Sequence, residues 1–252
     1  MGFQELLLSG IFVIIPLAIA VVLKLGLTKD IVIASVRSIV QLLIVGVILT
    51  FVFDSDSSIY MILMIIVMIG AASQNVIKKG TRIPGIKWII ILTLTAVEVV
   101  SMTIMLLSGI LDFEPEQIIP ISGMIIGNCM VLSLLFVSKF TDELEKDEEM
   151  IELILSFGGQ PKDAVSRSLK SAIQTSMIPT IESQKTIGLV QLPGMMSGLI
   201  IGGAPPMEAV MYQLLILFLI LTNATAASVM VGFLSYPKLF NSRMQYKGLK
   251  NE

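Results

Sequence analysis

The stretch TDELEKDEEMIELILSFGGQPKDAVSRSLKSAIQTS (residues 141–176) is about the only long polar run in a chain that is otherwise built from apolar segments. Apolar side chains recur inside it at Met150, Ile154 and Phe157, which is the spacing of one face of a helix. A second run with the same periodicity follows after Pro161. The stretch is therefore predicted to contain two amphipathic helices.

A stop signal and a start signal separate these two helices. Gly158 and Gly159 suit the positive φ at which many helices end, and Pro161 suits the first position of a new helix. We therefore predict helix, tight turn and helix, an element too small to bury a core of its own. It is expected to dock on a partner. A solvated linker is the alternative reading.

Composition identifies the rest of the chain as membrane-spanning. Of its 252 residues, 55% are hydrophobic and 14% charged, and the mean hydropathy is +0.90. A helix needs about 20 apolar residues to cross a bilayer. The fold class predicted is an all-α integral membrane protein with about seven spans, at residues 5–24, 31–53, 59–77, 87–111, 117–139, 180–203 and 208–234.

The distribution of charge gives an expected orientation. Basic residues cluster at alternate ends of the predicted spans, whereas the opposite turns carry Asp54, Asp56, Asp112, Glu114 and Glu116 and no Lys or Arg. By the positive-inside rule, the amino terminus is expected outside and the carboxyl terminus in the cytosol. Residues 141–176 then lie on the cytosolic side.

Several classes of function are disfavoured. The net charge is −2, so nucleic acid is not an expected partner, and the chain has no histidine and only Cys129 as a thiol. GTRIPGIK at residues 80–87 has Ile86 where a phosphate loop has lysine. No catalytic pair is visible, so the chain is not expected to be an enzyme or to hold a cofactor. If ATP drives it, ATP and Mg are expected on another chain.

The predicted sixth span has an unusual composition. GLVQLPGMMSGLIIGGAPP, at residues 188–206, places Pro193 and Gly194 in the middle of the membrane. Pro removes a backbone donor, and freed carbonyls, such as that of Leu189, can face a substrate path. The alternative is a kinked packing helix whose glycines are contact points, namely Gly188, Gly198, Gly202 and Gly203.

Polar and sulfur-containing side chains inside the spans are candidate pathway residues. Glu98 lies near the middle of the fourth span, where a carboxylate costs roughly 2.5 to 3.5 kcal/mol. It is expected to serve a cation or proton path, or else to be a protonated structural group. Met195 and Met196 lie beside the Pro193–Gly194 break and, with Glu98, are candidate metal contacts. The alternative is that these methionines are ordinary apolar residues that fill space. Amides such as Gln191 and Asn128 are expected mainly to bond helices to one another.

Two motifs resemble a known family. Glu152 followed six residues later by Gly158 resembles the E-A-A-x-x-x-G loop by which ABC permeases engage their ATPases, although Leu153 and Ile154 replace the two alanines. GLVQLPGMMSGLIIGGAPPMEAVMYQ, at residues 188–213, is similar to the FetB-type permease family, and this likeness extends over nearly the whole chain.

The resemblance implies a permease subunit, residues 1–252 forming one domain, in a bacterial inner membrane. Its implied partners are a cytosolic ABC ATPase, a second permease chain and a metal cation. Bacterial members of the family are associated with iron export and resistance to oxidative stress, and plant relatives with aluminium tolerance. Glu152, Gly158 and Gly159 would form the coupling loop, and Phe157 its apolar knob. Glu98, Gln191, Pro193, Gly194, Met195 and Met196 would line the path. A proton-coupled secondary transporter acting through Glu98 without an ATPase is the alternative, and a non-conducting membrane scaffold is a further one.

Overall fold

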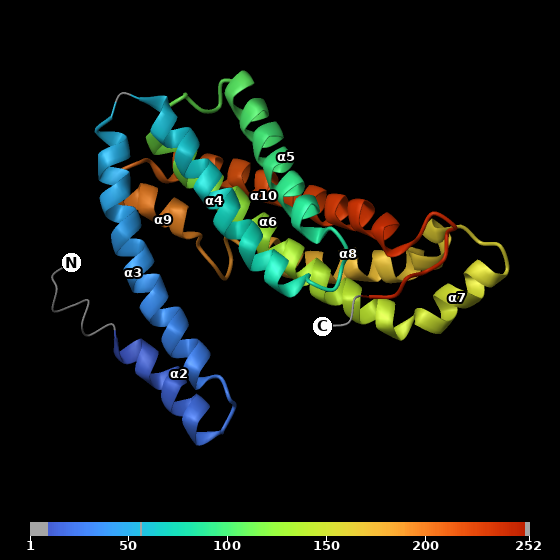
Figure 1. Ribbon diagram of the computed structural model, residues 1–252. Helices are drawn as coiled ribbons and strands as arrows, with labels where there is room; N and C mark the ends of the chain where they lie inside the picture. Colours follow the sequence, from blue (N-terminus) through green and yellow to red (C-terminus); the bar gives the residue numbers. More distant parts are fainter. Residues whose placement is uncertain (1–9, 56, 250–252) are drawn as a thin grey trace. The chain divides into compact units, whose positions relative to one another are not determined.

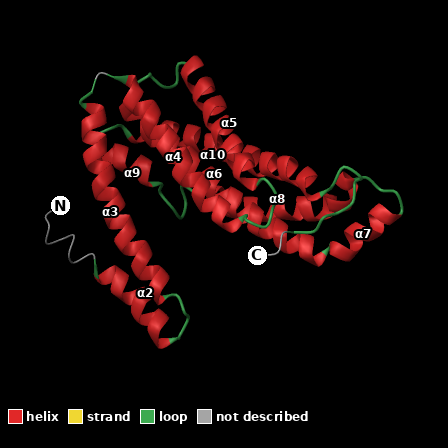
Figure 2. Ribbon diagram, in the orientation of Figure 1, coloured by secondary structure: helices red, strands yellow, loops and turns green. Residues whose placement is uncertain are grey.

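A computed structural model describes residues 10–55 and 57–249 (Figure 1). All regular structure in this part of the chain is helical, with no strand (Figure 2). The chain divides into two units, Met1–Ser57 and Ser58–Glu252, and each is described by itself. The all-helical prediction is therefore confirmed for the described residues.

The first unit is a helical hairpin. Its helices are α2 (Ile11–Val22) and α3 (Thr28–Phe53), which pack against each other. The turn between them contains Lys24 and Gly26, both at positive φ. Residues 5–9 of the predicted first span lie outside the described residues.

The second unit carries the remaining elements. They are α4 (Ser58–Lys79), α5 (Ile86–Leu107), α6 (Pro115–Lys146), α7 (Glu148–Ser156), α8 (Pro161–Thr186), α9 (Gly194–Ile201), α10 (Pro206–Ser235) and the 3-10 turn η1 (Tyr236–Leu239). The helix α6 is central because α4, α5, α8 and α10 all pack against it. One face of α6 is accordingly buried from Ile118 to Leu144, and it is mainly apolar, with Ser122, Ser133 and Thr141 among its buried residues.

Five helices are long and apolar enough to cross a membrane. They are α3, α4, α5, α6 and the run from α10 through η1. These match five of the seven predicted spans, while the described part of the first predicted span is the 12-residue helix α2. The chain is thus a multi-pass membrane protein, and a count of seven spans stays a prediction.

The prediction of a single helical span at residues 180–203 was wrong. The helix that starts at Pro161 continues without interruption to Thr186, so it joins the predicted polar helix to the first part of this span. The chain then leaves helical conformation over residues 187–193 before α9 begins. The boundary between the polar helix and the sixth span was misplaced because apolar composition resumes near Ser176, and the polar helix was therefore expected to end there.

The glycines of this region are not packing contacts. A Cβ placed on Gly188, Gly198 or Gly203 would have no heavy atom within 4 Å, and one on Gly202 would meet only its own helix backbone. Gly188 and Gly203 instead adopt positive φ, of 88° and 97°. The broken helix is therefore the correct reading, and the kinked packing helix is not.

Close helix packing occurs elsewhere, at Gly232 of α10. A Cβ there would lie 2.7 Å from Leu169 Cδ1 and 3.0 Å from Phe136 Cζ. The Phe136 ring stacks on that of Phe140, with centroids 5.3 Å apart. The absence of a side chain at Gly232 thus lets α10 approach α6 and α8.

We expect Gly232→Ala to lower the midpoint of thermal unfolding in detergent, because the new methyl group overpacks this contact at a cost of about 1–3 kcal/mol. Gly198→Ala is the matched control, since it makes the same change in a helix with open space around it. Both variants gain the same helix propensity, so their difference reports packing. Equal midpoints would show that the α6–α10 contact is looser than described.

Candidate functional site

The turn between α7 and α8 has the geometry that its sequence predicts. Gly158 has φ of 83°, its N–H donates to Leu155 O (3.0 Å), and the Gly159 N–H donates to Ile154 O (2.9 Å). This is a Schellman motif, and Pro161 then starts α8 at its first position. The prediction of helix, tight turn and helix is confirmed.

Gly159 is required in this turn for steric reasons. A Cβ at this position would lie 2.5 Å from Ile154 Cγ2 and 2.8 Å from the Ile154 carbonyl oxygen. We call residues 148–161 the elbow. Its backbone is fixed by hydrogen bonds and sterics, so it is a defined surface and not a loose linker.

The elbow has one anchored face and one exposed apolar face. Ile151 is fully buried, whereas Met150, Leu153 and Phe157 are 47%, 49% and 84% exposed. Ile154, which was predicted to share this apolar face, is half-buried. Phe157 is therefore the most prominent apolar side chain of the elbow, and Glu152 is exposed beside it.

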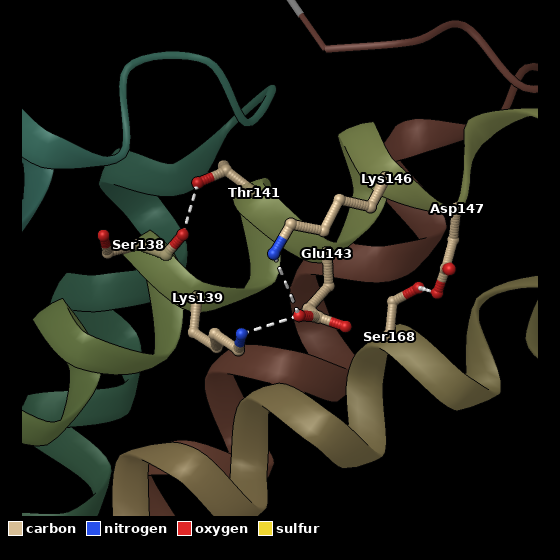
Figure 3. A network of polar contacts seen from close by, with 7 residues as sticks. All are labelled: Ser138, Lys139, Thr141, Glu143, Lys146, Asp147 and Ser168. Atoms are coloured by element: carbon tan, nitrogen blue, oxygen red, sulfur yellow. Dashed lines mark hydrogen bonds and ion pairs between the residues drawn. The ribbon is translucent and has the colours of Figure 1, made fainter.

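Polar contacts lie next to the elbow, along the last turns of α6 and between its end and α8 (Figure 3). The Ser168 hydroxyl of α8 donates to Asp147 Oδ2 over 2.9 Å, at the point where α6 ends. On α6, Glu143 pairs with Lys139 at 2.6 Å and with Lys146 at 3.8 Å. Some charges of the polar run therefore have structural partners within the chain.

No motif in the sequence predicts that the carboxyl-terminal segment lies beside the elbow. Asn241 Oδ1 accepts hydrogen bonds from the backbone N–H groups of Arg243 and Gln245, both at 2.9 Å, and closes a tight turn. The Phe240 and Tyr246 rings pack with centroids 5.7 Å apart. Asn241 is a turn-forming residue that could have predicted the turn, although not its location.

A hollow of about 440 Å³ separates this turn from the elbow. Its lining combines Glu152, Gly158 and Gly159 with Arg243, Met244 and Tyr246, among others. Burial raises the pKa of Tyr246 to about 12, and the charge of Glu148 adds to this increase. Three of the four predicted coupling residues therefore border one hollow, and the fourth, Phe157, lies next to it in the chain.

The helix α8 reaches deep into the bundle. Gln184 Nε2 donates to the Leu217 carbonyl oxygen of α10 over 2.8 Å. Leu217 lies 11 residues after the start of α10, which corresponds to roughly 16 Å along a helix. The last turn of α8 is thus level with the interior of an apolar span.

The outward face of α8 at this depth is mixed, because polar side chains are exposed there together with Ile178 and Ile181. Glu182 and Lys185 form an ion pair at 2.7 Å, and their side chains are 59% and 62% exposed. Ser183 and Thr186 are exposed on the same turns. The sequence analysis assigned these residues to the predicted sixth membrane span, so an exposed ion pair was not expected there.

Two adjoining hollows follow the groove between α6 and α8. One, of about 190 Å³, includes the polar side chains of Asn128, Thr180, Ser183 and Gln184 in its lining. The other, of about 380 Å³, includes Ser138, Lys139, Asp142 and Thr175. Both border Pro179, so together they follow the groove from the polar end of α6 into the bundle.

The break after α8 holds most of the predicted pathway residues. The Gly188 N–H donates to the Gln191 carbonyl oxygen over 2.9 Å, which closes a small loop before Pro193. Gly194 starts α9, and Met195 and Met196 are half-buried there. Leu189 is 92% exposed. These residues therefore lie in and directly after the break. The helix α9 that follows packs chiefly on α10.

Glu98 has different surroundings. Its side chain is 3% exposed in α5, next to Ser122 of α6, and within the described part of the chain neither carboxyl oxygen accepts a well-formed hydrogen bond. The Ser122 hydroxyl is also buried without a partner. Nearby, the Ser101 hydroxyl donates to Asn223 Oδ1 of α10 over 2.6 Å. Glu98 therefore belongs to a polar cluster inside the bundle.

The described residues contain no group of three or more His, Cys, Asp or Glu side chains that could hold a metal ion. Glu98 lies beside α6, whereas Met195 and Met196 lie on α9. The structure thus places the three predicted metal contacts in different surroundings, and a shared metal site stays a prediction.

Comparisons with known proteins agree over nearly the whole chain. The "UPF0014 membrane protein YjkA" of Bacillus subtilis (strain 168) is 45% identical, covering 98% of this chain and 99% of the relative. The "Probable iron export permease protein FetB" of Escherichia coli (strain K12) is 35% identical, over 96% and 93%. The "Protein ALUMINUM SENSITIVE 3" of Arabidopsis thaliana is 30% identical, over 88% and 81%.

No solved structure matches the chain. Residues 3–240 match the family described as "Uncharacterised protein family (UPF0014)". This match includes all five helices of the described residues that are long and apolar enough to span a membrane. The chain is a membrane protein of the UPF0014 family, similar to FetB-type permeases.

Proposed function

We propose that this chain is the permease subunit of an ABC exporter that moves a metal cation, iron by analogy with the FetB relative, out across the bacterial inner membrane. A separate cytosolic ATPase would bind ATP and Mg and drive the cycle. The observation that carries the proposal is the elbow, a fixed helical turn that exposes an apolar knob, Phe157, beside Glu152. Two permease chains would assemble with two ATPases.

The elbow supports the docking part of the proposal. Partner hot spots are typically aromatic side chains that enter a pocket and lose their water. Phe157 is 84% exposed, and the Schellman turn at Gly158 and Gly159 fixes its position, so little entropy is lost on docking. The acids of α7, which include Glu148 and Glu152, favour a basic rim on the ATPase.

The broken helix supports the transport part. Non-helical backbone at membrane depth is tolerated only where protein covers it or where it lines a water-filled cavity. The break between α8 and α9 is backbone of this kind, and it leaves Leu189 and Val190 exposed on the chain. Its backbone groups, with Gln191, Pro193, Met195 and Met196, would line the outer part of the path. Glu98 would respond to the cation by gaining or losing a proton.

A second candidate function is a proton-coupled secondary transporter. Glu98 favours it, because ionisable side chains buried inside membrane spans mark ion pathways and proton relays. Such a transporter would need no ATPase. The elbow would then be an interaction surface without a role in transport.

Phe157→Ala is expected to weaken binding of the purified permease to its ATPase. Loss of a central aromatic contact costs about 2 kcal/mol, which is roughly 30-fold in Kd. Phe113→Ala is the control, since Phe113 is a comparably exposed ring on the loop before α6. Binding would be measured by titration in detergent, and membrane insertion would be unchanged. Equal affinity for the two variants would remove Phe157 from the interface.

Reconstituted vesicles decide between the two functions. With the ATPase present, we expect export of Fe²⁺ to require ATP, and we expect no Fe²⁺ movement when a pH gradient is applied to the permease alone. Fe²⁺ movement driven by the pH gradient and abolished by Glu98→Gln would instead establish the secondary transporter. Glu208→Gln, which changes an exposed acid at the start of α10, is the control for charge alone.

A further inference from the structure

The hollow between the elbow and the Asn241 turn, residues 240–247, has an exposed apolar residue on each side. Met244 of the turn is in its lining and is 62% exposed. Phe157 of the elbow, between two lining residues, is 84% exposed. Both sides belong to the second unit. Exposed apolar side chains that gather beside a hollow with polar groups around them are typical of an interaction surface.

Met244 is held in a backbone conformation that its residue type disfavours. Its φ is 60°, in the left-handed region where a Cβ is crowded. Asn241 maintains this conformation, because its carbonyl oxygen accepts a hydrogen bond from the Met244 N–H over 3.0 Å. The Asn241 amide also donates to Gln245 Oε1 over 2.7 Å. Such a conformation persists only where its surroundings enforce it, so the turn presents Met244 on a fixed backbone.

Acidic charge prevails on the side of the hollow where Tyr246 lies. Burial is the main cause of the raised pKa of Tyr246, and the charges of nearby carboxylates add to it. These carboxylates are Glu148, Glu145 and Glu152, and Arg82 opposes them. Arg82 is paired with Glu145, whereas none of the ion pairs among the described residues involves Glu152. A base that enters the hollow would therefore meet an acid that has no ionic partner.

We propose that the hollow receives an arginine side chain of the ATPase and that the Asn241 turn is a second contact of that interface. The choice of partner rests on the proposed function. A guanidinium pairs with a carboxylate and stacks on an aromatic ring, and the lining offers both in Glu152 and Tyr246. Arg243 of the opposite wall favours an acid on the ATPase beside that arginine. Phe157 enters the ATPase and the arginine enters the permease, so the two surfaces interlock.

Filling the hollow tests whether a partner side chain enters it. Ser156→Trp is expected to weaken binding of the full-length permease to the ATPase that copurifies with it about 10-fold, because the indole takes the space. Gln160→Trp is the matched control, since Gln160 is exposed at the start of α8, lies outside the lining and makes no side-chain cap. Equal Kd values for the two variants would overturn the entry of a side chain.

Met244→Gly separates a contact role from a structural one. Glycine adopts positive φ freely, so we expect the midpoint of thermal unfolding to be no lower than that of the wild type. Binding to the ATPase is nevertheless expected to weaken several-fold, because the exposed apolar tip is lost. Met244→Ala removes the tip while it keeps a Cβ, and it is expected to weaken binding equally. Wild-type affinity of both variants would remove the Asn241 turn from the interface.

Glu152→Gln tests the charge of the entering group. We expect Kd to increase about fivefold at low salt and to depend less on salt, because an ion pair across the interface is lost. Glu149→Gln is the matched control, on the same helix and exposed but outside the lining. Equal effects of the two substitutions would show that the total charge of α7 decides binding, and would overturn a base in the hollow.

Phe157→Ala, measured beside these variants, distinguishes a failure of this inference from a failure of the proposed function. If Phe157→Ala weakens binding and neither Ser156→Trp nor Met244→Gly does, the hollow is outside the interface and the proposed function stands. If none of the three weakens binding, the ATPase does not dock at this end of the bundle, and both proposals are wrong.

Discussion

The close approach of α10 to α6 at Gly232 is the contact on which the second unit depends. Phe136 occupies the space that a side chain at Gly232 would take, and Leu169 of α8 reaches the same point. Three helices thus meet where one of them has no Cβ. Without a hydrophobic driving force between helices in lipid, van der Waals packing of this kind carries much of their association.

The buried face of α6 extends from this contact to the base of the elbow. Its buried face continues from Phe136 and Phe140 to Leu144, beyond the point where the apolar span was predicted to end. Asp147 then holds Ser168 of α8 directly below α7. The elbow is therefore an extension of the core of the bundle, and its exposed ring is presented on a rigid base.

Local signals in the sequence predicted the elbow well. Gly158, Gly159 and Pro161 act through backbone geometry, which depends on few neighbours, and the structure has the turn where they predict it. Near Pro193 the sequence left a broken helix and a kinked packing helix open, and the structure has the break, over residues 187–193. Apolar composition likewise predicted the five long spans, because crossing lipid imposes a minimum length.

Features that depend on distant contacts could not be predicted in this way. The continuity of α8 through Ser176 was missed because composition changes there although the helix does not. The hollow between the Asn241 turn and the elbow is lined by segments about 90 residues apart, and no local signal encodes that distance. The separate surroundings of Glu98 and Met195 are likewise set by which helices pack together.

The unbroken course of α8 has a mechanical consequence. Its 26 residues form a rod of roughly 39 Å, gripped near its middle by buried residues that include Leu169, Ala172 and Met177. Both ends of the rod are exposed, one at the elbow and the other at the break before α9. Because Pro179 lacks the N–H that would bond to the preceding turn, the part of α8 beyond it is the easiest to bend, and a displacement of the elbow end would be carried as a rigid motion only as far as Pro179.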